Sequence, residues 1–449
     1  MRLTDLQKLF EERDIHPNKR LGQCFLVDDN VARWIVDQAG ITEDDTVVEV
    51  GPGAGSLTQH LIGRVRRLVL VEKDNKLAEL LTERYADLAP AVTVIHGDAM
   101  DYDVRQHFPE GPVKLIGNLP YSVGNEIIRT FLNPPSPVEL AVVMVQREVA
   151  LRICSDAGGK NYGILSLMMQ ERWKPELLKT VGPQLFFPRP AVDSSIIRLT
   201  PRASGELPPH CPQVFESLVR RGFSQRRKQL RKNLGVEPEL WNPAIEAIGA
   251  SVDTRAQELN LKQWVNLSNL LEPHPAGKHA QRGDEVFDVV DENDVVTGQS
   301  TRAEVHAQGL LHRAVHVLVF NPKGEVYLQK RSMLKDTHAG KWDSSSSGHL
   351  DAGEDYAAAA IRELNEELLV APAKPLERLG KVAAGPGTDN EFVEIYRAES
   401  RGKGFRIHGN EIDCGGFFPL PLVDEWIATR PEDFATGFKT TFAAVRGNL

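Results

Sequence analysis

The chain has few cysteines for its length, and the four that it has lie far apart along 449 residues. Cys24, Cys154, Cys211 and Cys414 form neither a CxxC pair nor a zinc-like spacing, so neither a disulfide framework nor a structural zinc site is indicated. No apolar run approaches the roughly 18 residues that span a membrane. The first twenty residues have acids where a signal peptide needs an apolar core. We therefore expect a cytoplasmic protein with no membrane partner.

Positive charge is also in deficit, since 53 basic and 62 acidic side chains give a formal net charge of −9. This balance argues against a protein that coats nucleic acid over its whole surface. One stretch departs from it and contains no acid. Its basic residues are Arg220, Arg221, Arg226, Arg227, Lys228, Arg231 and Lys232. On a helix they would cover a wide face, which we expect to bind phosphates, although a solvated helix surface is an alternative.

Short β-branched apolar runs alternate with helix-like stretches in the first part of the chain. The runs are residues 46–50, 67–72, 92–95, 113–116 and 140–145. This alternation predicts an α/β fold with a Rossmann-like, doubly wound sheet. The pattern of apolar, helix-forming and Pro- or Gly-rich residues then changes twice along the chain. We expect the sheet domain over residues 1–200, a small helical RNA-binding domain over 201–272, a Pro- and Gly-rich linker over 273–283, and a second α/β domain over 284–449.

A Gly-rich loop follows the first of these predicted strands. In "VVEVGPGAGSLT", Gly51 and Gly53 let the backbone turn sharply and approach a ligand before the chain enters a helix. No Lys-Ser/Thr follows, so the loop is not a P-loop. Glu72 ends the next strand, 21 residues after Gly51, where an acid accepts hydrogen bonds from ribose hydroxyls, and Asp98 follows the third strand. Strand ends of a parallel sheet meet at one edge, so we predict a nucleotide-type cofactor site there.

The motif NLPY, residues 118–121, follows the fourth predicted strand at the same edge. The exocyclic amine of a nucleobase is a poor nucleophile, because its lone pair is delocalised into the ring. The Asn118 amide oxygen and the Leu119 carbonyl are suited to accept its two hydrogens and to hold the lone pair toward an electrophile. Pro120 restricts the turn that points them inward. Tyr121 supplies a face for stacking, so the motif predicts methylation of an adenine amine.

These features resemble the ribosomal RNA adenine dimethyltransferase family, over roughly residues 17–272. The resemblance rests on "NKRLGQCFL", "VEVGPGAGSLT", "VEKD", "GDAM", "GNLPYSV", "MVQREVA", "YGILS", "FFPRPAVDSSIIRL" and "FSQRRKQLRKNL". It implies S-adenosylmethionine as the methyl donor, with contacts on Cys24, Leu26, Gly51, Gly53, Glu72, Asp98 and Asn118. It also implies that Phe186 sandwiches the target base with Tyr121, although Phe186 is equally compatible with a core position. Cys24 departs from the family, which usually has Asn there.

The resemblance implies a substrate as well. The small-subunit members of the family convert two adjacent adenosines near the 3′ end of small-subunit (16S) ribosomal RNA to N6,N6-dimethyladenosine, within the assembling 30S subunit. The patterns FxPxPxVDS and QRRKxLRxxL favour these members over the related large-subunit methyltransferases. Two alternatives stay open at this point. One is a large-subunit enzyme, and the other is a ribosome-assembly checkpoint factor that only binds immature subunits.

A second group of reactive side chains lies in "GHLDAGEDYAAAAIRELNEELLV", residues 348–370. Glu363, Glu366 and Glu367 stand at positions i, i+3 and i+4, which places them on one face of a helix. Three carboxylates so close repel one another unless a divalent cation lies among them, and Mg²⁺ or Mn²⁺ prefers oxygen ligands of this kind. The spacing therefore predicts a metal site that binds a diphosphate and activates water.

This second segment resembles the Nudix hydrolase signature, with similarity over about residues 284–430. The resemblance implies an α/β/α Nudix fold, metal-dependent pyrophosphohydrolase activity and a small diphosphate-containing substrate. Glu391 and Glu411 are both candidates for the distal acid that some Nudix enzymes use as a metal ligand or base. Leu369 departs from the signature, which has Gly after the Glu pair.

The sequence around the box also resembles isopentenyl diphosphate isomerase, whose metal-binding histidines map to His306, His312 and His349. That isomerase needs a cysteine where this chain has Ser347, whereas the Glu set of the Nudix box is complete. Hydrolysis is therefore favoured over isomerisation, within an isomerase-like Nudix sub-family. A Nudix domain that only senses a ligand is a further alternative.

Overall fold

The computed structural model describes residues 2–18, 21–274, 277, 283–372, 374–400 and 405–449. The chain folds as two compact units, which we describe separately. One comprises residues 1–203, 223–230 and 254–261, and the other comprises residues 204–222, 231–253 and 262–449. Most of the predicted linker, 273–283, lies outside the described residues. Within the described part of the chain, no helix combines the length and the apolar character needed to cross a lipid bilayer.

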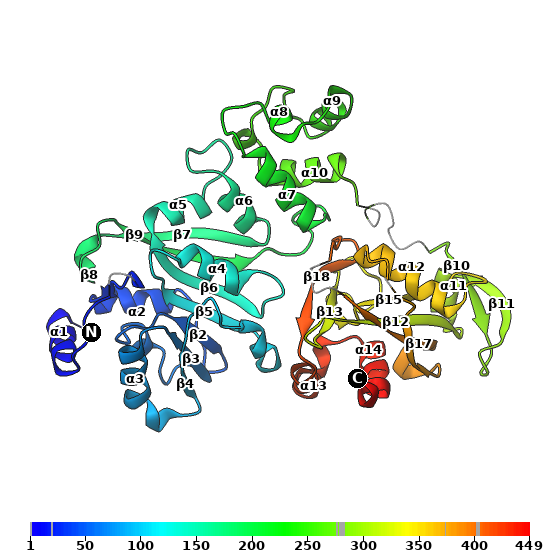
Figure 1. The fold of residues 1–449 in the computed structure, drawn as a ribbon, viewed down its shortest axis with the longest axis horizontal. Helices are drawn as coiled ribbons and strands as arrows, with labels where there is room; N and C mark the ends of the chain where they lie inside the picture. Colours follow the sequence, from blue (N-terminus) through cyan, green and yellow to red (C-terminus); the bar gives the residue numbers. More distant parts are fainter. Residues whose placement is uncertain (1, 19–20, 275–276, 278–282, 373, 401–404) are drawn as a thin grey trace. The chain divides into compact units, whose positions relative to one another are not determined.

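A seven-stranded sheet forms the centre of the first unit, with the order β4-β3-β2-β5-β6-β9-β7 (Figure 1). Its strands are β2 (Thr46–Val50), β3 (Arg67–Glu72), β4 (Val92–His96), β5 (Val113–Asn118), β6 (Val138–Gln146), β7 (Trp173–Val181) and β9 (Ser194–Pro201). The first five are parallel, and β9 and β7 add antiparallel pairs at one edge. The predicted Rossmann-like class and its parallel strands are confirmed.

Helices cover both faces of this sheet, because the central strands are apolar on both sides. Val48 and Val50 of β2 belong to the core on one face, and Val47 belongs to the core on the other. The first core is closed by α4 (Gly124–Leu132), α5 (Arg147–Ile153) and α6 (Ile164–Gln170), and the second by α2 (Asp29–Asp37) and α3 (Asn75–Arg84). α1 (Leu3–Glu12) packs its own apolar face against Phe25.

The Gly-rich loop leads into a short 3₁₀ segment, η2 (Thr58–His60), and not into the α-helix that the sequence predicted. Gly51, Gly53 and Gly55 have φ angles of 67°, 58° and 86°. L side chains rarely adopt this region, which explains the glycines. Three residues of this conformation within one loop interrupt any right-handed helical run, so the chain reaches Thr58 through a series of turns.

The predicted helical segment contains α7 (Pro212–Gly222), α8 (Leu230–Leu234), α9 (Pro238–Ala247) and α10 (Leu261–Leu271). The basic run does not lie on one helix, so that prediction was wrong. α7 ends at Gly222, whose carbonyl accepts a hydrogen bond from the Asn233 side chain at 2.6 Å. Arg220 and Arg221 therefore close α7, while residues 226–228 lie in the turn before α8. Glycine is a poor helix former, which fits a helix end at this position.

The second unit contains another seven-stranded sheet. Its strands are β12 (His312–Phe320), β13 (Val326–Arg331), β14 (Trp342–Asp343), β15 (Ser346–His349), β16 (Glu377–Val382), β17 (Glu391–Glu399) and β18 (Ile412–Phe418). Val315 and Val317 of β12 pack on α12 (Tyr356–Leu368) on one face. On the other face, Thr441 of α14 (Thr436–Val445) contacts His316 of β12 at 3.3 Å. The expected α/β/α arrangement is confirmed.

A separate hairpin and two further helices also belong to this unit. β10 (Val286–Val290) and β11 (Val296–Thr301) form a separate antiparallel hairpin. α11 (Arg302–Gln308) follows directly, with Thr301 as its N-cap, and α13 (Leu420–Thr429) precedes α14. The turn from β11 into α11 carries Arg302 and His306 toward the start of β12.

Candidate active sites

The carboxyl edge of the first sheet gathers the predicted cofactor residues around one cavity. The carboxyl ends of β2, β3, β4 and β5 supply Gly51, Glu72, Asp98 and Asn118 in turn. Residues 24 and 26 enter the same cavity from β1 (Phe25–Leu26) and the loop before it. Parallel register explains this convergence, because neighbouring strands end at the same edge. The full predicted set that lines the cavity is Cys24, Leu26, Gly51, Gly53, Glu72, Asp98 and Asn118.

Glu72 is buried at the end of β3 and is fixed by the Gly-rich loop. Its Oε2 accepts a hydrogen bond from the Gly53 N–H at 2.9 Å, and its Oε1 accepts one from the Asp74 N–H at 2.9 Å. Burial raises the pKa of this carboxyl, while the two N–H groups favour its ionised form. Each oxygen keeps a second acceptor position, which suits the paired hydroxyls of a ribose.

Asp98 lies at the end of the third strand and is partly exposed. Its Oδ2 pairs with the Lys73 ammonium at 2.5 Å, and its Oδ1 accepts a hydrogen bond from the Met100 N–H at 3.0 Å. The hydrogen bond from Lys73 lowers the pKa of Asp98, so the side chain is ionised at neutral pH. An ionised acceptor at this strand end suits an adenine amino group.

The orientation of Asn118 is decided by a main-chain acceptor. Its Nδ2 donates a hydrogen bond to the Cys24 carbonyl at 2.9 Å. A carbonyl can only accept, so Oδ1 is the amide atom left for a substrate amine. The Cys24 contact is a backbone contact, so it survives the replacement of the family's Asn at this position. Burial raises the pKa of the half-buried Cys24 thiol.

The rest of the NLPY motif is held by close backbone packing. A Cβ on Gly117 would lie 2.6 Å from the Val50 carbonyl oxygen of the neighbouring strand, so only glycine fits before Asn118. The Leu119 side chain is buried, and its N–H donates to the Met144 carbonyl at 3.0 Å. Tyr121 is half-buried, and its hydroxyl lies 2.6 Å from the Ser194 hydroxyl. Neither Gly117 nor Ser194 was predicted from the sequence as a site residue.

Phe186 does not share the cavity with Tyr121. It belongs to β8 (Phe186–Phe187), which pairs with β1 so that Phe186 stands opposite Leu26. Its side chain is 4% exposed and packs in the core with Leu57. Side chains alternate between the two sides of a strand, and Phe186 takes the core side while Phe187 is half-buried on the other. In this structure Phe186 is a core residue, which does not match its predicted contact with the base.

The basic residues of the helical segment make several local contacts. Arg220 pairs with Glu216 at 2.6 Å, one helical turn earlier, and Arg221 pairs with Glu272. Arg226 donates to the Lys160 carbonyl at 2.9 Å, and Arg231 donates to the Val236 carbonyl at 3.3 Å. Arg227 and Lys228 are exposed.

The three carboxylates of the Nudix box lie on α12 as predicted, but they differ in burial. Glu363 and Glu367 are 9% and 4% exposed, whereas Glu366 is exposed. Arg362 donates to Glu363 at 2.7 Å, to Glu366 at 3.3 Å and to Glu354 at 2.9 Å. Burial raises the pKa of both Glu363 and Glu367. Two buried, adjacent carboxyl groups are the donor set that a hard divalent cation requires.

Two neighbours of the box fix its geometry. Glu367 Oε2 accepts hydrogen bonds from the Ser347 N–H and from the Gln329 side chain, both at 3.2 Å. A Cβ on Gly348 would lie 2.1 Å from the Glu363 carboxyl carbon, so the glycine that opens the box leaves the space in which Glu363 lies. Gln329 was not predicted, because nothing in its sequence surroundings distinguishes it.

The box opens on a cavity that also contains basic groups and both candidate distal acids. Arg331 pairs with Asp343 at 3.0 Å, and Lys335 pairs with Glu411. Glu411 and Glu367 line the same cavity. Glu391 is engaged by histidines instead. Cations beside an acidic metal site are suited to hold phosphate oxygens.

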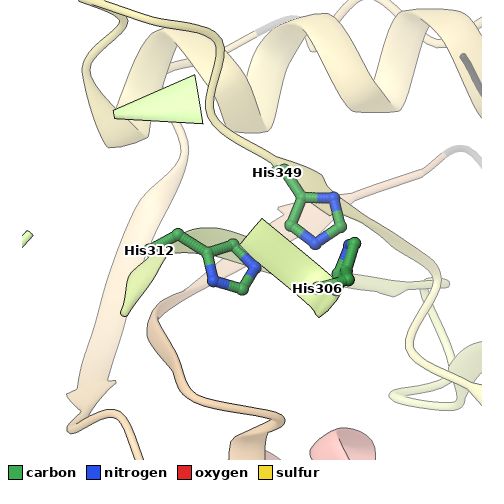
Figure 2. Close-up of side chains that lie close together, drawn as sticks. All are labelled: His306, His312 and His349. Carbon is green, nitrogen blue, oxygen red and sulfur yellow. The ribbon is translucent and has the colours of Figure 1, made fainter. Parts of the chain in front are cut away.

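Figure 2 shows that His306, His312 and His349 converge from α11, β12 and β15. One potential ligand atom of each lies within 4.8 Å of those of the other two. Glu391 Oε1 lies 3.0 Å from His349 Nε2 and 3.5 Å from His312 Nε2. Burial lowers the pKa of His349 to about 4, so its ring is neutral. Although burial alone favours the neutral acid, contacts with both histidines hold the pKa of Glu391 below its usual range.

The tautomer of His312 follows from its contacts. Its Nδ1 lies 2.9 Å from the Leu310 carbonyl, so Nδ1 carries a hydrogen and Nε2 is the ring nitrogen that faces Glu391. Neither His312 Nε2 nor His306 Nε2, both buried, has a hydrogen-bond partner among the described residues. The 3.5 Å approach of Glu391 is within ion-pair range but lacks hydrogen-bond geometry. Buried imidazole nitrogens without a hydrogen-bond partner, beside a carboxylate, are the kind of donor atoms that a metal ion binds.

Comparison with known proteins agrees with these geometries. The family described as ribosomal RNA adenine dimethylase matches residues 15–272, and the NUDIX domain family matches residues 310–435. The ribosomal RNA small subunit methyltransferase A of Lachnoclostridium phytofermentans is 36% identical over 264 residues, which cover 57% of this chain and 91% of that protein. The protein of the same name from Paracoccus denitrificans is 37% identical over 278 residues, which cover 61% of this chain and 98% of that one.

Among solved structures, the 23S rRNA methyltransferase ErmE matches with a TM-score of 0.47 and 28% sequence identity, covering 55% of this chain and 99% of that chain. The family match over residues 15–272 spans more than half of the sequence. It includes the Gly-rich loop, Glu72, Asp98 and the NLPY motif. The chain belongs to the ribosomal RNA adenine dimethylase family and carries a NUDIX domain in its C-terminal part.

Proposed function

We propose that the first unit transfers methyl groups from S-adenosylmethionine to N6 of adenosine in small-subunit ribosomal RNA. The observation that carries this proposal is the orientation of Asn118, whose Nδ2 is bound to the Cys24 carbonyl so that Oδ1 is free. The same cavity contains Glu72 and Asp98, which suit the ribose and adenine of the donor. The names of the relatives support the small-subunit substrate.

The chemistry follows from the acceptors of the motif. Asn118 Oδ1 and the Leu119 carbonyl accept the two N6 hydrogens, and Tyr121 stacks on the base. S-adenosylmethionine, when bound, supplies an electrophilic methyl group. With the donor bound, the nitrogen lone pair would form the new N–C bond as the S–CH₃ bond breaks; S-adenosylhomocysteine would leave, and the displaced proton would pass to water. A monomethylated amine keeps one hydrogen for one acceptor, so the same site accommodates a second transfer to N6,N6-dimethyladenosine.

The test is Asn118→Ala. We expect methyl transfer to small-subunit RNA to fall by about 100-fold or more, in line with the loss of one preorganised polar contact in a catalytic site. Binding of S-adenosylmethionine should persist, because Glu72 and Asp98 remain. Asn133→Ala, at the exposed C-terminal end of α4, is the control. Methylation by Asn118→Ala at the wild-type rate would refute the assignment of the motif.

We further propose that the enzyme acts in the cytoplasm on two adjacent adenosines near the 3′ end of the RNA, within the assembling 30S subunit. Phosphates of the RNA are bound by Arg220, Arg221, Arg226, Arg227, Lys228 and Arg231. Arg227 and Lys228 are exposed and suited to this role. Alanine at either position should lower the slope of log affinity against log salt by about one. An unchanged slope would exclude that residue from the contact.

For the second unit we propose metal-dependent cleavage of a diphosphate bond in a small substrate. Glu363, Glu366 and Glu367 would hold Mg²⁺ or Mn²⁺, which polarises the diphosphate and activates water. Arg331 and Lys335 line the same cavity and are suited to hold phosphate oxygens. Ser347 stands where the isomerases need a thiol, so hydrolysis fits the residues better. Glu366→Gln and Glu367→Gln should each abolish turnover in a panel of nucleoside diphosphate derivatives, and unchanged turnover would refute the site.

We also propose a second metal position formed by His306, His312, His349 and Glu391. Support comes from the three imidazoles, whose potential ligand atoms lie within 4.8 Å of one another, and from the buried Nε2 atoms of His306 and His312, which have no hydrogen-bond partner among the described residues. Imidazole nitrogens favour borderline metals such as Zn²⁺ and Co²⁺ over Mg²⁺. Titration with Co²⁺ should give a visible absorption band that His312→Ala removes. His338→Ala, in the same cavity but outside this set, is the control. Equal bands in both variants would refute the second position.

A further inference from the structure

Two residues of the NLPY motif are held from outside the motif. Asn118 is fixed by the Cys24 carbonyl, and the Tyr121 hydroxyl lies 2.6 Å from the Ser194 hydroxyl. Cys24 and Ser194 come from segments that are 94 and 73 residues away from these partners. The contact with Cys24 orients the Asn118 amide. The contact between Ser194 and Tyr121 serves no step of the proposed methyl transfer.

Ser194 is a rigid anchor. Its side chain is 0% exposed, and it is the first residue of β9. It stands opposite Gln146 of β6 on one side and Val181 of β7 on the other, so strands flank it in both directions. Pairing with both strands fixes the backbone that carries the Ser194 hydroxyl. Its bond to Tyr121 therefore restricts the tyrosine.

The tyrosine needs this restriction. The backbone before Tyr121 is fixed by Gly117 and Leu119, but the ring itself turns about two side-chain bonds. Its hydroxyl is the one polar atom at the far end and lies on the axis of the second bond, so a hydrogen bond there fixes the first torsion and with it the position of the ring. Stacking on a base requires the ring at a defined position. Burial raises the pKa of the Tyr121 hydroxyl, so the phenol stays protonated and the bond persists at neutral pH.

We propose that Ser194 is a positioning residue of the methyltransferase, which holds the Tyr121 ring at the position where it stacks on the target adenine. This rests on the proposed role of Tyr121. It also gives the segment "FFPRPAVDSS" a place in the site that differs from the expected one. Phe186 of that segment is in the core, and the segment contacts the motif through the hydroxyl eight residues later.

The test is a double-mutant cycle on the full-length protein, with Ser194→Ala, Tyr121→Phe and the double variant. Loss of one hydrogen bond should lower kcat/KM for the RNA by about fivefold. The effect should lie in the KM for RNA, with the KM for S-adenosylmethionine unchanged. Ser194→Ala and Tyr121→Phe remove the two ends of one bond, so the double variant should be no worse than either single variant.

The matched control is Ser195→Ala. Ser195 is equally buried in the same strand, but its hydroxyl bonds to Thr180 at 2.9 Å, away from the motif. A second readout uses RNA with 2-aminopurine at the target position, whose fluorescence reports stacking. Ser194→Ala should change the fluorescence of the bound RNA, and Ser195→Ala should not.

The outcomes separate this inference from the function on which it rests. Tyr121→Ala serves as the reference for the stacking role. If it methylates RNA normally, the proposed role of Tyr121 fails, and the role of Ser194 fails with it. If Tyr121→Ala is inactive while Ser194→Ala matches Ser195→Ala in both readouts, only the positioning role is refuted. Additive losses in the cycle would also refute it, because they show that Ser194 acts independently of the Tyr121 hydroxyl.

Discussion

Gly348→Ala isolates the contribution of Glu363 to the Nudix box. The added Cβ would lie 2.1 Å from both the carboxyl carbon and Oε1 of Glu363, and 2.5 Å from Oε2. Ordinary contact begins at 3.4 Å, so the carboxylate has to move by about 1.3 Å, the difference between these two distances. Gly348 does not have a positive φ, so alanine fits its backbone without strain. The substitution therefore acts on one side chain.

Gly348→Ala should lower metal affinity strongly and change the free energy of unfolding little. The displaced atoms are the end of a flexible side chain, which moves at little cost to the free energy of unfolding. A metal–oxygen bond of about 2.1 Å does not survive a shift of more than half its length. Loss of one well-placed group at a metal site lowers metal affinity by about 10- to 100-fold. Hydrolysis at limiting Mn²⁺ should fall in the same proportion.

Isothermal titration with Mn²⁺ measures this directly, with thermal unfolding as the check on the fold. Gly298→Ala is the control, because no atom lies within 4 Å of the Cβ position there. Methyl transfer by the same chain supplies an internal standard that should stay constant. If Gly348→Ala binds Mn²⁺ as wild type does and hydrolyses its substrate at the same rate, Glu363 is not a ligand and the predicted site is incorrect.

Three further substitutions test other parts of the chain. Glu49 is 1% exposed, and burial raises its pKa from 4.5 to about 8. Between these values the unfolded state releases the proton and the folded state does not, so stability falls with rising pH by about 1.4 kcal/mol per unit. In urea denaturation, the free energy of unfolding of Glu49→Gln minus that of the wild type should be larger at pH 8 than at pH 4. The same difference at both pH values would contradict this prediction. Leu369 is the C-cap of α12 and has φ 53°, so Leu369→Gly should raise the free energy of unfolding by about 1 kcal/mol. A melting temperature below that of the wild type would contradict this prediction. Cys24→Asn restores the family residue and keeps the backbone acceptor; it should strengthen S-adenosylmethionine binding by about fivefold in a titration, and an unchanged affinity would show that this side chain does not contact the cofactor.

The sequence predicts those features of the sites that depend on local spacing. β-Branched runs mark the strands because a buried parallel strand is apolar on both faces, and strand ends in a parallel sheet meet at one edge. Gly51, Glu72 and Asp98 therefore share a cavity, as expected. Glu363 and Glu367 are four residues apart on one helix, so their proximity follows from helix geometry alone.

Contacts between distant segments cannot be predicted from local spacing. Ser194 and Tyr121 are 73 residues apart, and Gln329 and Glu367 are 38 apart. A serine and a glutamine are common residues, and nothing in their neighbourhoods distinguishes them. Phe186 shows the related difficulty for short strands. A two-residue strand has no periodicity, so its sequence does not indicate which aromatic ring faces the core.

Consecutive residues of the Nudix domain contact two different sets of side chains. Side chains alternate along β15, so neighbouring positions face opposite ways. Gly348 leaves space for Glu363 of the box, while His349 bonds to Glu391 in the histidine set. The first set offers oxygens and the second offers mainly imidazoles, so the two sets favour different metals. Loss of one metal should therefore leave the other bound. The proposed histidine site and the proposed metal site of the box are compatible in one domain, because they need not share a cation.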